Sequence, residues 1–325
     1  MGSSALRAAR LCLSYLRRGS GEGIVGALWI LALVPVVLAI SGDGAAVEAE
    51  EYSPYADPAK PVLSVLLSDP QNVEEFRKEF GLTGAEVEEV RAAVRTENER
   101  LSEEYAESER IVESSKALST DQIKSKIATS DYDETVTATV ARTKSNIEAL
   151  LPENRRDDLK VWVDEQWGQE ARAASTEDSA EVVTTRSGGR ALRCKVFATQ
   201  YIGYTRYEAA LPHRTLKFGS KPRVRIRRVA GGNVVRPRIK EVGPWNTYDN
   251  YWAARANRTM WKNLPRCKPE AQAAYFNNYN HGKDEFGRNV LNPAGADLTP
   301  TIARRMGLRK YQNAWVYVWF PWVRP

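Results

Sequence analysis

The stretch His213–Ile226, HRTLKFGSKPRVRI, is the segment that decides how the second half of this 325-residue chain folds. It starts with a histidine, passes a Gly-Ser pair and ends in alternating basic and apolar residues. Because successive side chains of a strand point to opposite faces, Val224 and Ile226 are expected to face a core while Arg223, Arg225 and Arg227 face outward. Two shorter sequence motifs follow, Glu241-Val-Gly-Pro244 and Asp297-Leu-Thr299.

Taken in order, the three sequence motifs resemble those of the rare lipoprotein A-like double-psi β-barrel family. That family acts on cell-wall polysaccharides and shares its fold with expansins. That family has a His-[RK]-Thr-Leu segment running into a strand, then an Asn-Asp-x-Gly-Pro turn, then Asp-Leu-Ser opening a helix. The resemblance covers residues 191–325 and implies a six-stranded double-psi β-barrel. It implies nothing about the rest of the chain.

The resemblance also implies a catalytic site that cleaves a glycan strand. Asp297 would be the acid, His213 would hydrogen-bond to Asp297 or to the substrate, and Glu241 would replace the family's aspartate with a side chain one methylene longer. A lytic transglycosylase needs an acid at the leaving oxygen and a base for the sugar's own hydroxyl, and one carboxyl can serve both steps in turn. Glu208 is the nearest counterpart of a further acidic residue in the family.

Two alternatives stay open at this site. Asp297 could act only as the N-cap of a helix over Pro300–Met306, and His213 could be a structural histidine at the start of a strand. Expansin-like relatives keep the aspartate but loosen polysaccharide without hydrolysing it. A non-catalytic glycan-binding or wall-scaffolding protein is therefore the competing hypothesis.

The distribution of charge predicts two domains. Residues 51–186 carry 30 acidic against 17 basic side chains, whereas residues 191–325 carry 7 against 25. A division this sharp indicates two units with different partners. Peptidoglycan or another anionic wall glycan is the partner expected for the basic unit, and no nucleic-acid motif favours DNA or RNA.

The N-terminal residues predict export. Four arginines precede Ile24–Ile40, an apolar run of a length that suits either a signal-peptide core or a membrane anchor. We assign residues 1–49 to this export signal or anchor and 50–61 to a spacer. The protein is expected outside the cytoplasm, secreted or held at the cell wall through the uncleaved apolar segment.

The acidic region predicts a bundle of four or five helices over residues 62–172, followed by a linker over 173–190. Thr83 and Ser119 each open a capping box, S/T-x-x-E/Q, before apolar residues at helical spacing. We interpret the carboxylates on the second long helix as a solvated face: Glu103, Glu104, Glu107 and Glu109. The region from 50 to 188 has no His or Cys, so we expect no metal there, and we expect no cofactor anywhere in the chain.

About fifty residues between Glu241 and Asp297 form an aromatic insertion in the predicted barrel. Its rings could stack on sugar faces, or they could form the insertion's own core. Trp245 and Trp252 flank a turn and are the best candidates for exposed, substrate-binding rings. The predicted substrate-binding residues are Trp245, Trp252, Tyr248 and Arg225.

Two cysteines follow the apolar run, Cys194 and Cys267. In an exported protein such a pair predicts a disulfide, which would tie the first barrel strand to the insertion. The alternative is two buried thiols.

Overall fold

The computed structural model describes residues 52–175, 180–184, 190–203, 205–218 and 222–323. They belong to one compact unit, Glu51–Pro325. The predicted export segment over residues 1–49 lies outside these ranges. Within them, no helix combines the length and the apolar character that crossing a lipid bilayer requires.

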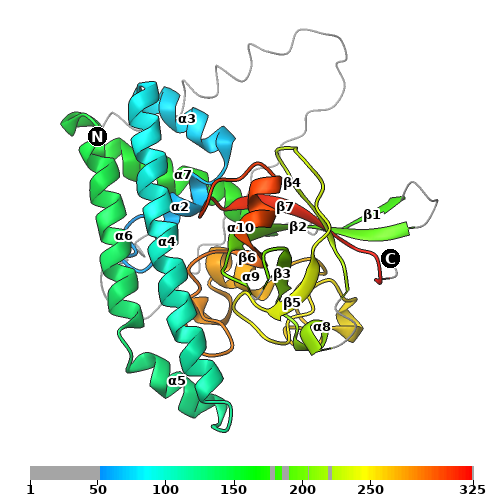
Figure 1. Ribbon diagram of the computed structural model, residues 1–325. Coiled ribbons are helices and arrows are strands. Elements are labelled where there is room, and N and C mark those ends of the chain that lie inside the picture. Colours follow the sequence, from blue (N-terminus) through cyan, green and yellow to red (C-terminus); the bar gives the residue numbers. More distant parts are fainter. Residues whose placement is uncertain (1–51, 176–179, 185–189, 204, 219–221, 324–325) are drawn as a thin grey trace, which may run out of the picture. The chain divides into compact units, whose positions relative to one another are not determined.

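The first part of the chain is helical, as predicted (Figure 1). Both capping boxes are present: Thr83 caps α4 with Glu86, and Ser119 caps α5 with Gln122. The helices of this part are α2 (Val62–Leu66), α3 (Pro70–Phe80), α4 (Gly84–Ser114), α5 (Thr120–Ala128), α6 (Tyr132–Ala149), the 3-10 turn η1 (Glu153–Arg155) and α7 (Arg156–Ser175).

Apolar residues at helical spacing bring these helices together. The α4 residues Val87, Val90 and Val94 are buried in the same cluster as Val136 and Ile147 of α6. Figure 1 shows α4 and α6 as long neighbouring helices, and they make many residue contacts. Burying one apolar stripe of each helix is what holds such a pair, because helix propensity alone is too weak.

The second part of the chain carries a mixed sheet of seven strands with short helices. Its strand order is β4-β7-β2-β6-β3-β5, and β1 pairs with β2 outside that path. The strands are β1 (Ala180–Thr184), β2 (Arg190–Gln200), β3 (Glu208–Leu211), β4 (Arg225–Arg228), β5 (Arg238–Val242), β6 (Ala294–Leu298) and β7 (Ala314–Phe320). The helices are α8 (Arg214–Phe218), η3 (Arg255–Asn257), α9 (Glu270–Asn277), η4 (Tyr279–Gly282) and α10 (Pro300–Arg305).

The sheet differs from the predicted six-stranded barrel in two ways. Its ladder is open, because the path ends at β4 on one side and β5 on the other. The seventh strand, β1, lies inside the predicted linker 173–190, where it pairs antiparallel with β2. Isolated bridges nevertheless join the two ends of the path, Arg223 with Arg238 and Ile226 with Val235.

Alternate residues along the strands point inward and form the hydrophobic core of the sheet. Val224 and Ile226 are fully buried, which confirms the expectation for this strand. They share one cluster with Cys194 of β2 and with Val316 and Val318 of β7. Cys194 also forms a disulfide with Cys267 of the insertion, with 5.1 Å between the two Cα atoms.

A single hydrophobic cluster joins the helical part to the sheet. It holds residues of α3, α4, α6 and α7 together with Phe197 of β2 and the α9 residues Tyr275 and Phe276. The Trp167 ring of α7 lies 4.9 Å from the ring of Tyr275 and 5.0 Å from that of Phe276. The two parts are therefore held together by buried aromatic contacts.

Trp167→Ala should destabilise the whole unit, because it removes a buried ring that contacts both parts. We expect a loss of about 3–5 kcal/mol in the free energy of unfolding, measured by urea denaturation. Val161→Ala on the same helix is the control, because Val161 is 55% exposed and its truncation should cost less than about 0.5 kcal/mol. Equal effects of the two changes would contradict the shared core.

Candidate functional site

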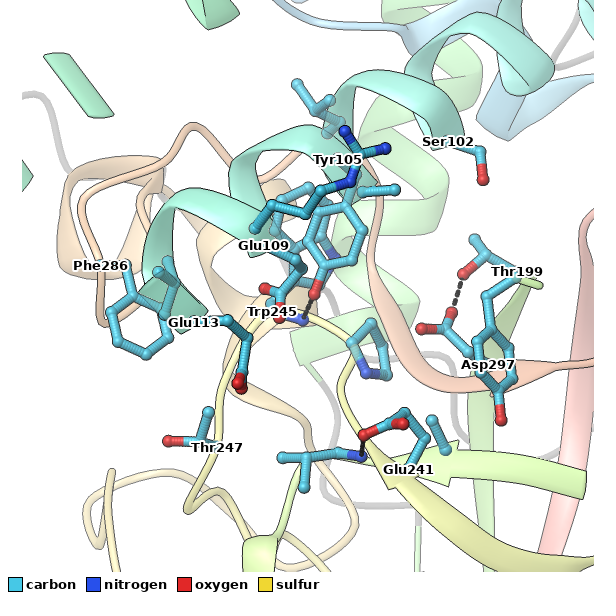
Figure 2. Close-up of a pocket in the computed structure, with 18 of the residues that line it drawn as sticks. Ser102, Tyr105, Glu109, Glu113, Thr199, Glu241, Trp245, Thr247, Phe286 and Asp297 are labelled. Carbon is cyan, nitrogen blue, oxygen red and sulfur yellow. Dashed lines mark hydrogen bonds between the residues drawn. The ribbon is translucent and has the colours of Figure 1, made fainter. Parts of the chain in front are cut away.

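A cavity of about 730 Å³ lies between helix α4 and the sheet (Figure 2). This volume is in the usual range for pockets that bind small ligands. The sheet contributes Thr199, Asp297 and Glu241, and α4 contributes Tyr105 and Glu109. The predicted acid therefore lies in a cavity whose walls come from both parts of the chain.

Asp297 is the fourth residue of β6, and the sheet holds it in place. It is paired in register with Thr199 of β2 and Ala210 of β3, and the Thr199 hydroxyl donates a hydrogen bond to its carboxylate (Figure 2). The N-cap of α10 is Thr299, whose own hydroxyl donates to backbone carbonyls instead of capping the helix. The interpretation of Asp297 as an N-cap is therefore wrong.

Burial changes the acidity of Asp297. Its side chain is only slightly exposed, and the loss of hydration raises the pKa of its carboxyl to about 7. The hydrogen bond from Thr199 opposes this rise, and the negative charge of Glu109 adds to it. A carboxylic acid that keeps its proton near neutral pH can act as a general acid.

Helix α4 places Tyr105 beside Asp297. The backbone N–H of Trp245 donates a 2.8 Å hydrogen bond to the Tyr105 hydroxyl. Gly243 has φ +126°, and a Cβ at this position would lie 3.6 Å from the Tyr105 hydroxyl and 3.8 Å from Asp297 Oδ2. These are ordinary van der Waals distances, so the positive φ of Gly243, and not a lack of space, is what favours glycine in the Gly-Pro motif.

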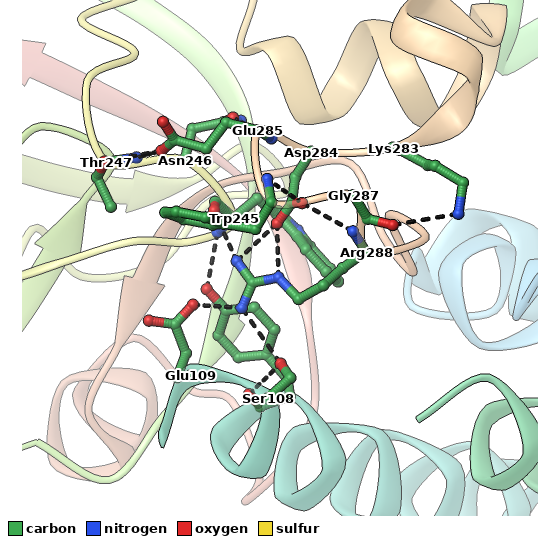
Figure 3. A network of polar contacts seen from close by, with 12 residues as sticks. Ser108, Glu109, Trp245, Asn246, Thr247, Lys283, Asp284, Glu285, Gly287 and Arg288 are labelled. Carbon is green, nitrogen blue, oxygen red and sulfur yellow. Dashed lines mark hydrogen bonds and ion pairs between the residues drawn. The ribbon is translucent and has the colours of Figure 1, made fainter. Parts of the chain in front are cut away.

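Arg288 fixes α4 against the insertion (Figure 3). Its fully buried guanidinium makes an ion pair of 2.6 Å with Asp284 and a second ion pair with Glu109. It also donates to Ser108 Oγ at 3.2 Å and to the Trp245 carbonyl at 2.8 Å. The two carboxylates and these acceptors compensate the buried charge, so Glu109 has a defined position on the cavity wall.

The structure places His213 away from this arrangement. Its ring nitrogens lie 2.7 Å from Thr215 Oγ1 and 3.3 Å from Thr259 Oγ1. The ring packs edge-on against Tyr248 and Trp252, and burial lowers its pKa. His213 is not among the residues that line the cavity, which departs from the predicted contact with Asp297.

The two other predicted acids lie in different surroundings. Glu241 lines the cavity from β5, and its carboxylate accepts a 3.1 Å hydrogen bond from the backbone N–H of Val242. Glu208 is fully buried outside the cavity lining, where Thr205 donates to it at 2.6 Å and Lys240 lies at 3.9 Å. Of these two predicted acids, Glu241 shares the cavity with Asp297 and Glu208 does not.

Of the four predicted substrate-binding residues, Trp245 and Tyr248 line the cavity, whereas Trp252 and Arg225 do not. Trp245 and Trp252 are 2% and 5% exposed, so the expectation that they are exposed is wrong. Trp252 stacks on Phe320 in the core of the sheet because the insertion folds back over β7, whereas Trp245 still lines the cavity. Tyr248 lines the cavity and is exposed, and Arg225 lies on β4 outside the cavity lining.

Sequence reasoning missed the residues that α4 contributes. Glu109 is paired with Arg288, and Glu104 is buried, so this part of the predicted solvated face was interpreted wrongly. Glu103 and Glu107 are exposed, as expected. The spacing of Tyr105 with the apolar stripe of α4 was a visible signal that this face is covered, but nothing in the sequence named Arg288 as its partner.

The charges around the cavity limit what it can bind. Its lining includes six carboxyl groups and three basic side chains. The carboxyl groups belong to Glu103, Glu109, Glu113, Glu241, Glu285 and Asp297, and the basic side chains are Arg110, Lys116 and Arg214. This balance favours a hydroxyl-rich neutral ligand over an anion. Within the described ranges, no group of three or more His, Cys, Asp and Glu side chains could hold a metal ion.

Comparison with known proteins gives a match in the part of the chain that contains the sheet. A family model described as a domain of unknown function (DUF8814) matches residues 178–319, which span β1 through most of β7. No curated protein matches the chain, and no solved structure matches it.

The raised pKa of Asp297 predicts how stability depends on pH. Between about pH 4 and pH 7 the unfolded chain releases this proton more readily than the folded chain, so raising the pH favours unfolding. Asp297→Asn removes this penalty, and its stability relative to the wild type should rise by up to about 4 kcal/mol across that interval. Urea denaturation of both proteins at each end of the interval measures the difference. Parallel pH dependence would contradict the protonated state.

Proposed function

We propose that this protein is an exported cell-wall protein that cleaves peptidoglycan glycan strands as a lytic transglycosylase of the rare lipoprotein A-like type. The observation that carries the proposal is the burial of Asp297, which raises the pKa of its carboxyl to about 7, inside a cavity large enough for a sugar unit. The carboxylate-rich lining suits the hydroxyl groups of a glycan.

The strand pairing supports a double-psi barrel as the underlying fold. Six of the strands, β2 to β7, lie on one continuous path that includes two parallel pairs, β2 with β6 and β3 with β5. The isolated bridges between residues 223–226 and 235–238 lie where closure of a six-stranded barrel would occur. The order of the three sequence motifs along this path supports the same assignment.

The proposed reaction uses one carboxyl twice. The protonated Asp297 gives its proton to the glycosidic oxygen as the bond to the anomeric carbon breaks. The resulting carboxylate takes the proton from the sugar's 6-hydroxyl as that oxygen attacks the same carbon. The products are a 1,6-anhydro sugar end and a chain with a free hydroxyl, so no water is consumed.

The second candidate function is glycan binding without cleavage, as in an expansin-like or wall-scaffolding protein. The position of His213 favours it, because both ring nitrogens face threonine hydroxyls and the ring lies outside the cavity lining. In this case the cavity would hold a sugar and Asp297 would serve only as a hydrogen-bond donor. The export segment and the wall location apply equally to both functions.

Substituting Asp297 separates the two functions. Asn keeps the size of the side chain and the acceptor for the Thr199 hydroxyl, but it cannot deliver a proton. Asp297→Asn should therefore lower turnover at least about a hundredfold, with wall binding retained. The measurement is the release of anhydro-ended fragments from purified peptidoglycan by the full-length protein, detected by mass spectrometry.

Asp121→Asn is the matched control, because the Asp121 side chain is 95% exposed on α5. Full cleavage by a folded Asp297→Asn protein would exclude Asp297 as the acid. Wall binding without any cleavage by the wild type would favour the non-catalytic function.

A further inference from the structure

Basic and aromatic side chains stand in register on strands β4, β7 and β2. The pairing places Trp319 between Arg225 and Arg193, and Tyr317 between Arg227 and Lys195. Side chains of directly paired residues lie on the same side of a sheet. They form two rows, which we call the cation–ring face: Arg225, Trp319 and Arg193 in one, and Arg227, Tyr317 and Lys195 in the other.

The cation–ring face lies on the outer side of the sheet. Along each strand the neighbouring residues point the other way, and Cys194, Ile226 and Val318 are fully buried in the core of the sheet. The next row on the outer side is Phe197 with Trp315, and Phe197 belongs to the core shared with the helices. The helices therefore cover one end of this side, and the cation–ring face is the neighbouring part.

The cations of this face lie against the rings. The guanidinium carbon of Arg193 is 4.2 Å from the centre of the Tyr317 ring, and that of Arg225 is 5.3 Å from the centre of the Trp319 ring. Among the described residues, the buried Nε atoms of Arg193, Arg225 and Arg227 have no hydrogen-bond partner. These contacts hold the guanidinium groups by cation–π attraction.

Such a guanidinium keeps its outer N–H groups available for a carboxylate or a phosphate, which it can bind in bidentate geometry. Two acidic residues of other elements partly balance the positive charge of the face. Glu181 of β1 forms a salt bridge with Arg193, and Glu170 of α7 interacts electrostatically with Lys195. Arg225 and Arg227 of β4 make none of the salt bridges found within the described ranges. They are the strongest anion-binding candidates of the face.

We propose that the cation–ring face binds a linear polyanionic glycan, with Arg225 and Arg227 contacting its charged groups. The choice of a glycan rests on the proposed function, whereas the anionic chemistry follows from the face itself. Base stacking by single-stranded nucleic acid would need open rings, but Trp319 is only 8% exposed and has cations against it. Insertion into a membrane would also need exposed apolar rings.

This face and the cavity complement each other in charge. Carboxyl groups outnumber basic side chains in the cavity lining, so this face favours the charged groups of a polymer and the cavity favours its uncharged sugar units. The structure thus separates the binding of charged groups, on β4, from the handling of a neutral sugar unit at Asp297. The face would retain the protein on the wall whether or not the cavity cleaves.

The test measures equilibrium binding of the full-length protein to polygalacturonate, a linear carboxylate glycan, with dextran as the neutral control. Arg225→Gln combined with Arg227→Gln should weaken binding at least about tenfold. The matched control combines Arg255→Gln with Arg304→Gln, two exposed arginines elsewhere in the basic part, and should change affinity less than about twofold. Neither double variant changes a residue of the cavity lining, and cleavage of peptidoglycan is measured in a separate experiment. A protein that does not cleave peptidoglycan would therefore leave this binding result unaffected.

A second measurement needs no variant. Polygalacturonate should protect Arg225 and Arg227 of the wild type from phenylglyoxal, and it should leave Arg255 and Arg304 reactive. Equal losses of affinity for polygalacturonate in both double variants would overturn the proposal in favour of diffuse charge attraction. Equal protection of all four arginines from phenylglyoxal would overturn it in the same way. Binding of single-stranded DNA or phosphatidylglycerol vesicles at this face, without binding of polygalacturonate, would overturn it in favour of those partners.

Discussion

The buried guanidinium of Arg288 is the contact on which the candidate site depends. It joins Asp284 of the insertion, Glu109 of α4 and the carbonyl of Trp245, so three segments distant in the chain meet at one charge. Removing one partner from such a group leaves an uncompensated charge in the interior and typically costs about 3–5 kcal/mol. The position of α4 over the sheet, and with it one wall of the cavity, is therefore coupled to this group.

This coupling gives the helical part a role in the chemistry of the site. The sheet alone supplies Asp297 and its hydrogen bond from Thr199, but α4 supplies the Tyr105 hydroxyl and the negative charge of Glu109. Burial between the two parts is what keeps a proton on Asp297 near neutral pH. A helical region predicted as a separate acidic bundle thus helps to set the acidity of a residue in another part of the chain.

Local signals in the sequence predicted local structure well. The capping boxes at Thr83 and Ser119 and the alternation at Val224 and Ile226 all follow from short-range rules, and the structure contains each of them. The long-range contacts could not be predicted in this way. Trp252 was expected to be exposed because its neighbours form a turn, but its burial depends on Phe320, nearly seventy residues later. The pairing of Glu109 with Arg288 spans an even longer separation.

Asp297 keeps its proton near neutral pH because it is buried in a cavity built by both parts of the chain. Its pKa can be measured directly by NMR titration of the full-length protein with ¹³C-labelled aspartate carboxyls. The signal that disappears in Asp297→Asn assigns the residue. We expect a midpoint at about pH 7. A midpoint close to 3.9, the ordinary value for an aspartate, would contradict it.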